Sequence, residues 1–288
     1  MQSNNYPHKV FDWKPYIKVI GIGYTGESVI NYMIEYDLND ADLIAINHKD
    51  ELRLKNNLHT FYESEFNIII CNLSEANVSS LLYDISKMSH SYGILTIVIA
   101  TFDENLFEYR HENIIKKIVN NSDSIIIIPN VKECHASLPT TSQQFYARDK
   151  KVVRAIRSLI CSATKNSIIA HDFTDIRTIT SVKGIACFGE GSASGENRVI
   201  KAVQNALRDL QLNEFQRGIC KALLVNLSVD DDFSLEEFDA AATLISETHS
   251  CKDEPDILVG LLPCEKTTDE AYVSIIATGI EVEAVLKK

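Results

Sequence analysis

Short apolar runs alternate with segments of helical periodicity along the first half of the chain. After the first run, Val29, Ile30, Met33 and Ile34 recur at the spacing of an amphipathic helix. Strands that are apolar on both faces and alternate with helices are typical of a parallel sheet covered by helices on both sides. The pattern therefore predicts an α/β half with buried strands at 17–20, 43–46, 66–70, 94–100 and 125–128.

A long helical pattern follows this half. It extends from Thr140 to about Lys165, contains no proline or glycine, and repeats apolar residues at helical spacing. A helix of about 25 residues spans roughly 40 Å at about 1.5 Å per residue. We expect a strut that spans a domain rather than an ordinary crossover helix.

The last third of the sequence predicts a second α/β domain, from about residue 180 to 282. Ser234-Leu235-Glu236-Glu237 is a capping-box pattern, which marks a helix start. The last two strands, joined through Glu265–Glu270, are expected to form an antiparallel pair. The predicted strands are at 185–188, 222–227, 257–262 and 271–277, and the predicted helices at 197–209 and 234–250.

Composition excludes several classes of function. The 288 residues are 45% hydrophobic and 24% charged, which is ordinary for a globular protein, and the net charge of −12 argues against a nucleic-acid surface or unaided binding to anionic lipid. Seven cysteines without a CxxC pair are typical of reduced thiols in the cytosol, and no zinc site is expected. The polar N-terminus has no secretory pattern, and no run is long enough for a membrane span. We expect a cytoplasmic protein without direct membrane binding.

Gly21-Ile22-Gly23-Tyr24-Thr25-Gly26 is a glycine-rich turn between the first strand and its helix. Read as G-x-G-x-x-G, it fits a dinucleotide site, because glycines let the backbone approach a pyrophosphate at a helix N-terminus. An NAD or FAD site also needs an acid at the end of the second strand, where this chain has Asn47. A tight turn without any ligand is the other alternative.

Two segments of the second half of the chain carry a resemblance to a known family. Ala170–Asp175 and Phe188–Arg198 resemble bacterial FtsZ, the tubulin-like division GTPase, and so do the opening strand and turn and Ile276–Gly279. The resemblance runs from about residue 17 to 280. It implies a parallel-sheet GTPase-type N-terminal domain, a long central helix and a smaller C-terminal α/β domain. The implied divisions are 1–139 for the nucleotide-binding-type domain, 140–179 for the central helix and synergy loop, and 180–288 for the C-terminal domain.

In this family two glycine-rich loops hold the phosphates of GTP. Gly21, Gly23 and Gly26 match the first loop, but Glu27 stands where glycine is usual. A carboxylate near a helix N-terminus satisfies the helix dipole and repels a triphosphate.

The second phosphate loop aligns with Cys71–Asn77, which is shorter than usual and contains no glycine. Without glycine the loop loses the left-handed conformations and the bare N–H groups that reach phosphate oxygens, and Glu75 adds a negative charge. Both loops have thus gained an acid. We expect GTP or GDP binding to be weakened or lost, and Mg²⁺ to bind only together with GTP.

The nucleoside side keeps more of the family pattern. Phe145 and Asp149 have the spacing that the resemblance assigns to stacking on guanine and to hydrogen-bonding its N–H edge. Asn130, Glu108 and Asn47 match further nucleotide-binding positions. The alternatives are that Phe145 packs in the core and that Asp149 is a solvated charge on a helix.

The synergy loop carries Asp172 and Asp175, which in FtsZ reach into the next subunit and position the water that attacks its GTP. The resemblance therefore makes these two residues the candidate catalytic pair, although Ala170 replaces the family's asparagine. Asp172 alternatively caps the segment that follows it. His171 is either a pH-sensitive interface group or an ordinary polar residue.

These features predict an FtsZ-like cytoskeletal protein with degenerate phosphate loops. It would act as a filament subunit or as a modulator of FtsZ-type polymers, binding itself or a conventional FtsZ head to tail through the acidic loop. The alternatives are an active, self-polymerising GTPase and a nucleotide-independent scaffold. No acidic and hydrophobic tail peptide follows Lys288, so we expect recruitment through another partner.

Overall fold

The computed structural model describes twelve stretches of the chain. At 109–112, 129, 141–147, 211–212 and 263 the description covers the backbone alone. The described stretches are 14–36, 38, 40–46, 63–75, 78–102, 109–129, 141–164, 171–212, 220–230, 233–248, 255–263 and 269–282.

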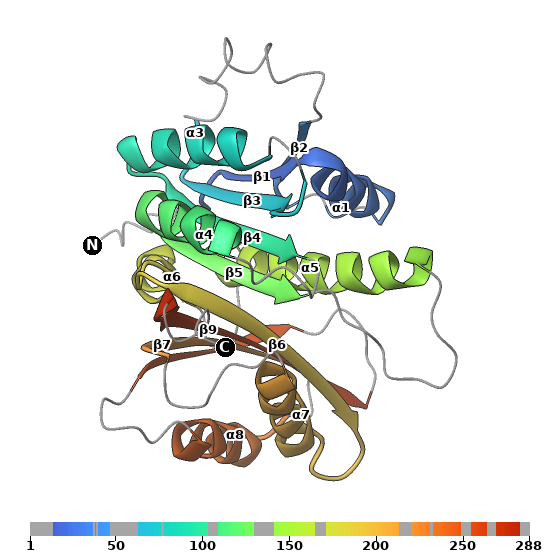
Figure 1. Ribbon diagram of the computed structural model, residues 1–288. Helices are drawn as coiled ribbons and strands as arrows, with labels where there is room; N and C mark the ends of the chain where they lie inside the picture. The colour runs from blue at the N-terminus through green and yellow to red at the C-terminus, as the bar shows by residue number, and fades with distance from the viewer. Residues whose placement is uncertain are drawn as a thin grey trace, which may run out of the picture.

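A single nine-stranded sheet forms the centre of the molecule, with strand order β2-β1-β3-β4-β5-β6-β9-β7-β8 (Figure 1). The first five strands in that order pair in parallel. Nearly every residue of β1, β3, β4 and β5 is buried, as expected for strands covered on both faces. These strands are β1 (Ile17–Ile22), β2 (Asp42–Ile46), β3 (Phe66–Asn72), β4 (Leu95–Phe102) and β5 (Ser124–Pro129).

Four of the described helices cover the two faces of this parallel part. α1 (Gly23–Glu35) and α5 (Thr141–Thr164) share one hydrophobic cluster with the strands. α3 (Val78–Ser91) and α4 (Tyr109–Asn121) belong to the other cluster. The predicted alternation of apolar strands and helices is therefore present, and α5 is the long helix that the sequence indicated.

The strands of the C-terminal half are β6 (Ile185–Ser194), β7 (Ala222–Val229), β8 (Asp256–Pro263) and β9 (Glu270–Ile280). β9 lies between β6 and β7 and is antiparallel to both, whereas β8 pairs in parallel with β7. The expectation that the last two strands form an antiparallel pair is therefore wrong. β9 is buried over most of its length, so it takes the position between two strands and leaves the edge to β8.

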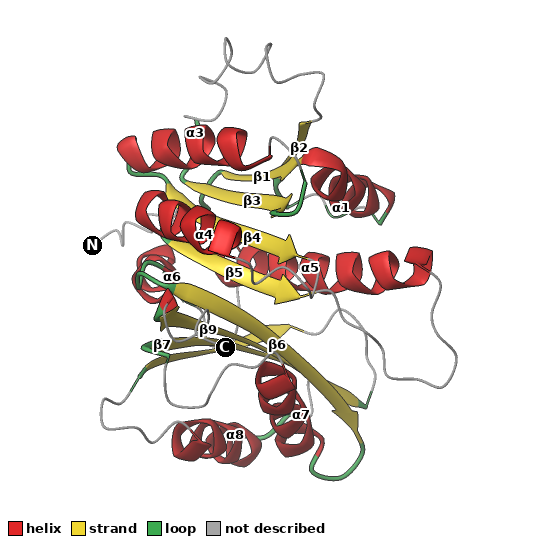
Figure 2. Cartoon of the chain, viewed as in Figure 1, coloured by secondary structure: helices red, strands yellow, loops and turns green. Residues whose placement is uncertain are grey.

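Three more helices complete the described fold: α6 (Phe173–Thr180), α7 (Arg198–Leu212) and α8 (Leu235–Thr248). α7 and α8 join the cluster that contains α3 and α4, while α5 packs on Phe188, Leu224 and Ile276 from the C-terminal strands. Figure 2 shows α7 and α8 below the C-terminal strands and α5 crossing behind the middle of the sheet. No described helix is long and apolar enough to cross a membrane.

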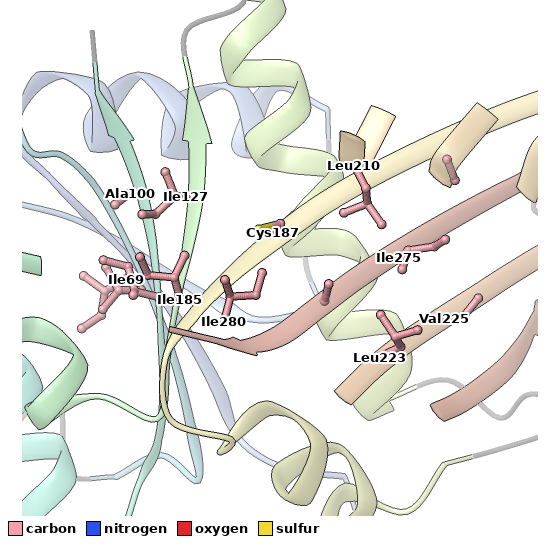
Figure 3. Close-up of a cluster of buried hydrophobic side chains, with 14 of the residues drawn as sticks. Ile69, Ala100, Ile127, Ile185, Cys187, Leu210, Leu223, Val225, Ile275 and Ile280 are labelled. Atoms are coloured by element: carbon pink, nitrogen blue, oxygen red, sulfur yellow. The ribbon is translucent and has the colours of Figure 1, made fainter. Parts of the chain in front are cut away.

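The two halves share one core where β5 and β6 meet. These strands pair in parallel over only two residue pairs, Ile125↔Ile185 and Ile126↔Ala186. Buried side chains nevertheless continue across the junction, as Figure 3 shows for Ile69, Ala100 and Ile127 beside Ile185, Cys187, Ile280, Leu210, Leu223, Val225 and Ile275. The predicted fold class is confirmed, while the boundaries at 139 and 179 stay a prediction.

Candidate functional site

The first glycine turn places the end of β1 directly against the first turn of α1. A methyl group on Gly21 would collide with the carbonyl group of Gly26, and one on Gly26 would collide with the backbone of Gly21. These two glycines therefore have a packing role whether or not a ligand binds. Gly23 begins α1 with φ of 77°, a left-handed conformation that favours glycine.

The carboxylate of Glu75 lies on the backbone N–H groups at the start of α1. The N–H of Tyr24 donates to Glu75 Oε2 at 2.7 Å, and the N–H of Thr25 donates to Oε1 at 2.9 Å. Both oxygens of one carboxylate thus satisfy two donors that the first turn of a helix leaves open. The negative charge also sits at the positive end of the helix dipole.

The short loop after β3 holds Glu75 in this position. The N–H of Ser74 donates to the side chain of Asn72 (2.9 Å), and the N–H of Glu75 donates to the carbonyl oxygen of Asn72 (3.1 Å). The N–H of Leu73 donates to the carbonyl oxygen of Thr101 in β4 (3.0 Å). The loop that lacks glycine therefore folds back as a turn and directs its acid at α1.

These contacts decide how well the site suits a phosphate. Backbone N–H groups at a helix N-terminus are suitable donors for phosphate oxygens. Here the N–H groups of Tyr24 and Thr25 already donate to Glu75, and a phosphate at the same point would meet its negative charge. As they stand, these residues do not fit a phosphate. Sequence reasoning placed Glu27 at the helix N-terminus, but the carboxylate that reaches these amides is that of Glu75.

Asp149 is engaged within the chain as well. Its Oδ1 accepts from Nε (2.9 Å) and Nη2 (2.6 Å) of Arg148, and its Oδ2 accepts from the hydroxyl of Ser28 in α1 (2.8 Å). Arg148 is 1% exposed and Asp149 is 5% exposed. Asp149 is therefore not a solvated charge on the helix surface. Sequence reasoning did not single out Arg148 or Ser28, because nothing in their spacing marks them.

Several predicted nucleotide-binding residues lie outside the described part of the chain. Asn47, Glu108 and Asn130 are in undescribed segments. Phe145 belongs to α5, but its side chain is not among those described. Their assignment stays a prediction from the resemblance.

In the acidic loop, Asp172 is the N-cap residue of α6. Its Oδ1 accepts from the N–H of Thr174 at 2.7 Å, and its φ and ψ of −72° and 147° are extended, as an N-cap requires. Asp175 lies in the first turn of α6, where a carboxylate stabilises the helix dipole. Both residues are exposed, so both carboxylates face solvent while one also caps the helix.

His171, just before the cap, packs against Gly260 of β8. A methyl group at Gly260 would meet the imidazole Nε2 at 2.5 Å, and this nitrogen is buried without a hydrogen-bond partner among the described residues. Burial lowers the pKa of His171, and the nearby charge of Asp175 opposes that shift. Burial therefore favours the neutral form of the ring.

The glycine turn and the acidic loop lie at opposite ends of the parallel strands. We call the end that carries Asp172 and Asp175 the acidic edge. α6 packs at the start of the strands, since Phe173 contacts Phe66 (ring centroids 6.1 Å apart) and Nη1 of Arg177 donates to the carbonyl oxygen of Gly93 (3.0 Å). Tyr24 and Glu75 lie where β1 and β3 end. Figure 2 shows α6 at the opposite side of the sheet from the start of α1.

The described residues offer little for metal or thiol chemistry. They contain no group of three His, Cys, Asp or Glu side chains that would hold a metal ion. Burial raises the pKa of both the Cys71 and the Cys187 thiols, so these cysteines stay protonated and unreactive.

Comparison with known proteins finds similarity to FtsZ proteins. A model of the FtsZ family C-terminal domain matches residues 184–281. The cell division protein FtsZ of Magnetospirillum gryphiswaldense is 28% identical to this chain, and the alignment covers 98% of this chain. The chain spans only 57% of the length of that protein. Cell division protein FtsZ 2 of Rhizobium meliloti is 26% identical, and the alignment covers 94% of this chain and 90% of that protein.

Solved structures share the fold over nearly the whole chain. An empty FtsZ dimer from M. jannaschii aligns with a TM-score of 0.80 and 20% identity, over 93% of this chain and 89% of that one. A GTPγS-bound protofilament of CetZ2 from Haloferax volcanii aligns with a TM-score of 0.73 and 13% identity, over 94% and 96%. These matches and the strand order described above support the prediction that the chain is a divergent relative of FtsZ, with the same fold.

Proposed function

We propose that this protein is a cytoskeletal subunit that binds GTP weakly or not at all and modulates FtsZ-type polymers through its acidic edge. The observation that carries the proposal is the contact of Glu75 with the N–H groups of Tyr24 and Thr25. It occupies the donors that the family uses for phosphate, while Asp172 and Asp175 stay exposed at the other edge. We infer a cytoplasmic setting, in keeping with the division proteins that the chain resembles.

The proposal depends on the polarity of head-to-tail assembly. A heterologous interface joins two different surfaces, so one subunit can keep one surface and lose the other. This chain keeps the exposed acids of α6 and fills its own glycine turn. Such a subunit would dock its acidic edge on the nucleotide edge of a conventional FtsZ and would offer a poor surface to the next subunit.

Co-assembly with a conventional FtsZ tests this function. We expect the chain to pellet with GTP-grown FtsZ polymers and to change their rate of phosphate release at substoichiometric amounts. The informative variant is Asp172→Asn with Asp175→Asn, because asparagine still caps a helix while both charges are lost. This variant should lose the effect on turnover and pelleting.

The control for that experiment lies on another surface. Asp239 and Glu247 are exposed acids of α8, so Asp239→Asn with Glu247→Gln removes the same charge elsewhere. The control variant should act like the unmodified chain. If the unmodified chain at equimolar ratio changes neither the turnover nor the pelleting of FtsZ, the modulator function is overturned.

A nucleotide-independent scaffold is the second candidate, and the Glu75 contact favours it equally. Light scattering of the chain alone separates the two functions. A scaffold would assemble by itself at the same rate with and without GTP, whereas a modulator would assemble only with its partner. GTP-dependent assembly that Asp172→Ala slows would instead favour an active GTPase.

A further inference from the structure

Two internal contacts hold the first two turns of α1. Glu75 binds the N–H groups of Tyr24 and Thr25, and Asp149 binds the hydroxyl of Ser28. The first contact reaches α1 from the loop after β3, and the second reaches it from α5. The start of α1 is therefore tied to two distant parts of the chain by acidic side chains.

The first contact has the chemistry of a bound oxyanion. The carboxylate of Glu75 presents two oxygens to two adjacent N–H groups at a helix N-terminus, as a phosphate does. The fit is close, because a methyl group on Gly23 would collide with Glu75 Oε2. Glu75 thus fills the anion site formed by the N–H groups of Tyr24 and Thr25, and this site requires glycine at position 23.

The other oxygen of Asp149 is bound by Arg148, a group with the chemistry of a purine edge. Arg148 presents Nε–H and Nη2–H together to one oxygen of Asp149 (2.9 and 2.6 Å). A guanidinium and the N1/N2 edge of guanine both consist of N–H donors on one planar carbon. The acid that the resemblance assigns to a guanine base is therefore bound by a side chain with a similar donor pattern.

We propose that Glu75 and Arg148 are built-in substitutes for a bound nucleotide, one at the phosphate end and the other at the base end. This inference deepens the proposed function and rests on it only for the identity of the ligand that is replaced. An internal group competes at an effective concentration on the order of millimolar or above, so a free nucleotide must displace both contacts to bind. The result is an α1 that is held in place without GTP.

Anion rescue tests the phosphate end. Glu75→Ala removes the carboxylate and leaves the N–H groups of Tyr24 and Thr25 open. We expect a lower Tm than in the unmodified chain, and we expect inorganic phosphate or pyrophosphate to recover part of that loss. The unmodified chain should show no specific gain, because its donors are occupied.

The matched control is another acid that accepts a backbone N–H at the start of a helix. Glu237 accepts the N–H of Ser234 at the start of α8, so Glu237→Ala also removes a carboxylate from a helix N-terminus. It should lower the Tm without recovery by phosphate, which separates specific binding from general salt stabilisation. Equal responses of all three proteins to phosphate, or no recovery of Glu75→Ala, would overturn the inference at this end.

Fluorescently labelled GDP tests both ends together. We expect no saturable binding to the unmodified chain, measurable binding to Glu75→Ala, and tighter binding when Arg148→Met is added. If Arg148→Met prevents folding, the comparison of Glu75→Ala with the unmodified chain still decides the result. Binding of the labelled GDP to the unmodified chain as tight as to Glu75→Ala would overturn the proposal.

The outcomes are distinct from those of the co-assembly experiment. Anion rescue and GDP titration use the chain alone, whereas the modulator function is measured with a conventional FtsZ. If rescue fails and co-assembly succeeds, only the internal substitution is wrong. If rescue succeeds and co-assembly fails, the modulator function is wrong and the internal substitution stands.

Discussion

At the scale of single residues, Gly23 and Glu75 form one unit. Gly23 has a φ of 77°, and a side chain there would collide with Glu75 Oε2. Gly93 also has a positive φ, of 69°, but a methyl group on Gly93 would meet no described atom within 4 Å. Comparing an alanine substitution at each glycine therefore separates two free-energy costs, that of a left-handed backbone and that of crowding the carboxylate.

Gly23→Ala should lower the free energy of unfolding by about 2–4 kcal/mol, and Gly93→Ala by only about 1–2 kcal/mol, the cost of a left-handed L-residue. Urea denaturation of both variants measures the difference. In a Glu75→Ala background the excess at Gly23 should shrink, because the colliding oxygen is gone. An equal loss of unfolding free energy in the two variants would show that Glu75 does not occupy the site at the start of α1.

His171 predicts a pH dependence of stability. Because its folded pKa is lowered, the unfolded chain binds more protons as the pH falls below the ordinary histidine value of about 6.5. The stabilisation is complete above that value and is lost as the pH falls toward the folded pKa. Urea denaturation between about pH 7.5 and 5 should show a steeper loss for the unmodified chain than for His171→Gln. Identical slopes would contradict the burial of Nε2.

The sequence identified only part of the site at this scale. It identified Gly21, Gly23 and Gly26 and the loss of glycine at 71–77, because glycine patterns are local. It recognised Glu75 only as an added charge, since the contact joins residues 51 and 50 positions apart. Ser28 was missed because its contact with Asp149 joins residues 121 positions apart. Arg148 directly precedes Asp149, but nothing in its spacing marks it.

At the scale of elements, charged groups fasten α5 to the C-terminal half. Nζ of Lys151 contacts both oxygens of Asp209 in α7 (2.9 and 2.8 Å), and Arg154 forms a bidentate ion pair with Glu190 of β6. The hydroxyl of Tyr272 in β9 donates to Glu190 Oε2 (2.8 Å), and burial beside this acid raises the pKa of Tyr272. One face of the long helix is thereby held to α7 and β6, and Tyr272 joins β9 to the same acid of β6.

Asp209→Ala should lower the free energy of unfolding by about 3 kcal/mol, because it leaves the buried ammonium of Lys151 without its partner. Arg208→Ala is the matched control on α7, since Arg208 is exposed and donates to the side chain of Asn205 in the same helix (3.3 Å); its effect should stay within about 0.5 kcal/mol. Chemical denaturation measures both. A loss for Asp209→Ala as small as that of the control would show that the ion pair does not fasten α5.

Strand prediction succeeded where residues are uniformly apolar. The parallel strands and α5 agree with their predicted ranges to within a few residues. β6 was predicted only for 185–188, yet it continues to Ser194 and pairs with β9 along that length. The extension contains Gly189, Gly191 and small polar residues, which have low strand propensity, and they are strand only because β9 and α7 pack on them.

At the scale of the whole molecule, the two edges of the sheet differ in kind. One edge carries exposed acids, and the other carries a glycine turn filled by an internal acid. The sequence indicated both features through the family resemblance, but the resemblance alone could not show that the turn was filled. That result depends on the three-dimensional path of the loop after β3.

Because the glycine turn is filled, GTP should have no effect on self-association of the chain. We expect right-angle light scattering of the purified protein to be the same with GTP, with GDP and without nucleotide. A conventional FtsZ in the same buffer is the positive control. A GTP-dependent rise in scattering of this chain would contradict its independence from nucleotide.

The most direct test of the account is the nucleotide content of the purified protein. The chain would be denatured, and any released nucleotide would be separated and quantified against the protein concentration. The account predicts no GDP or GTP in the unmodified chain, because Glu75 and Arg148 occupy the groups that would hold it. Release of GDP or GTP at about one molecule per chain would contradict it.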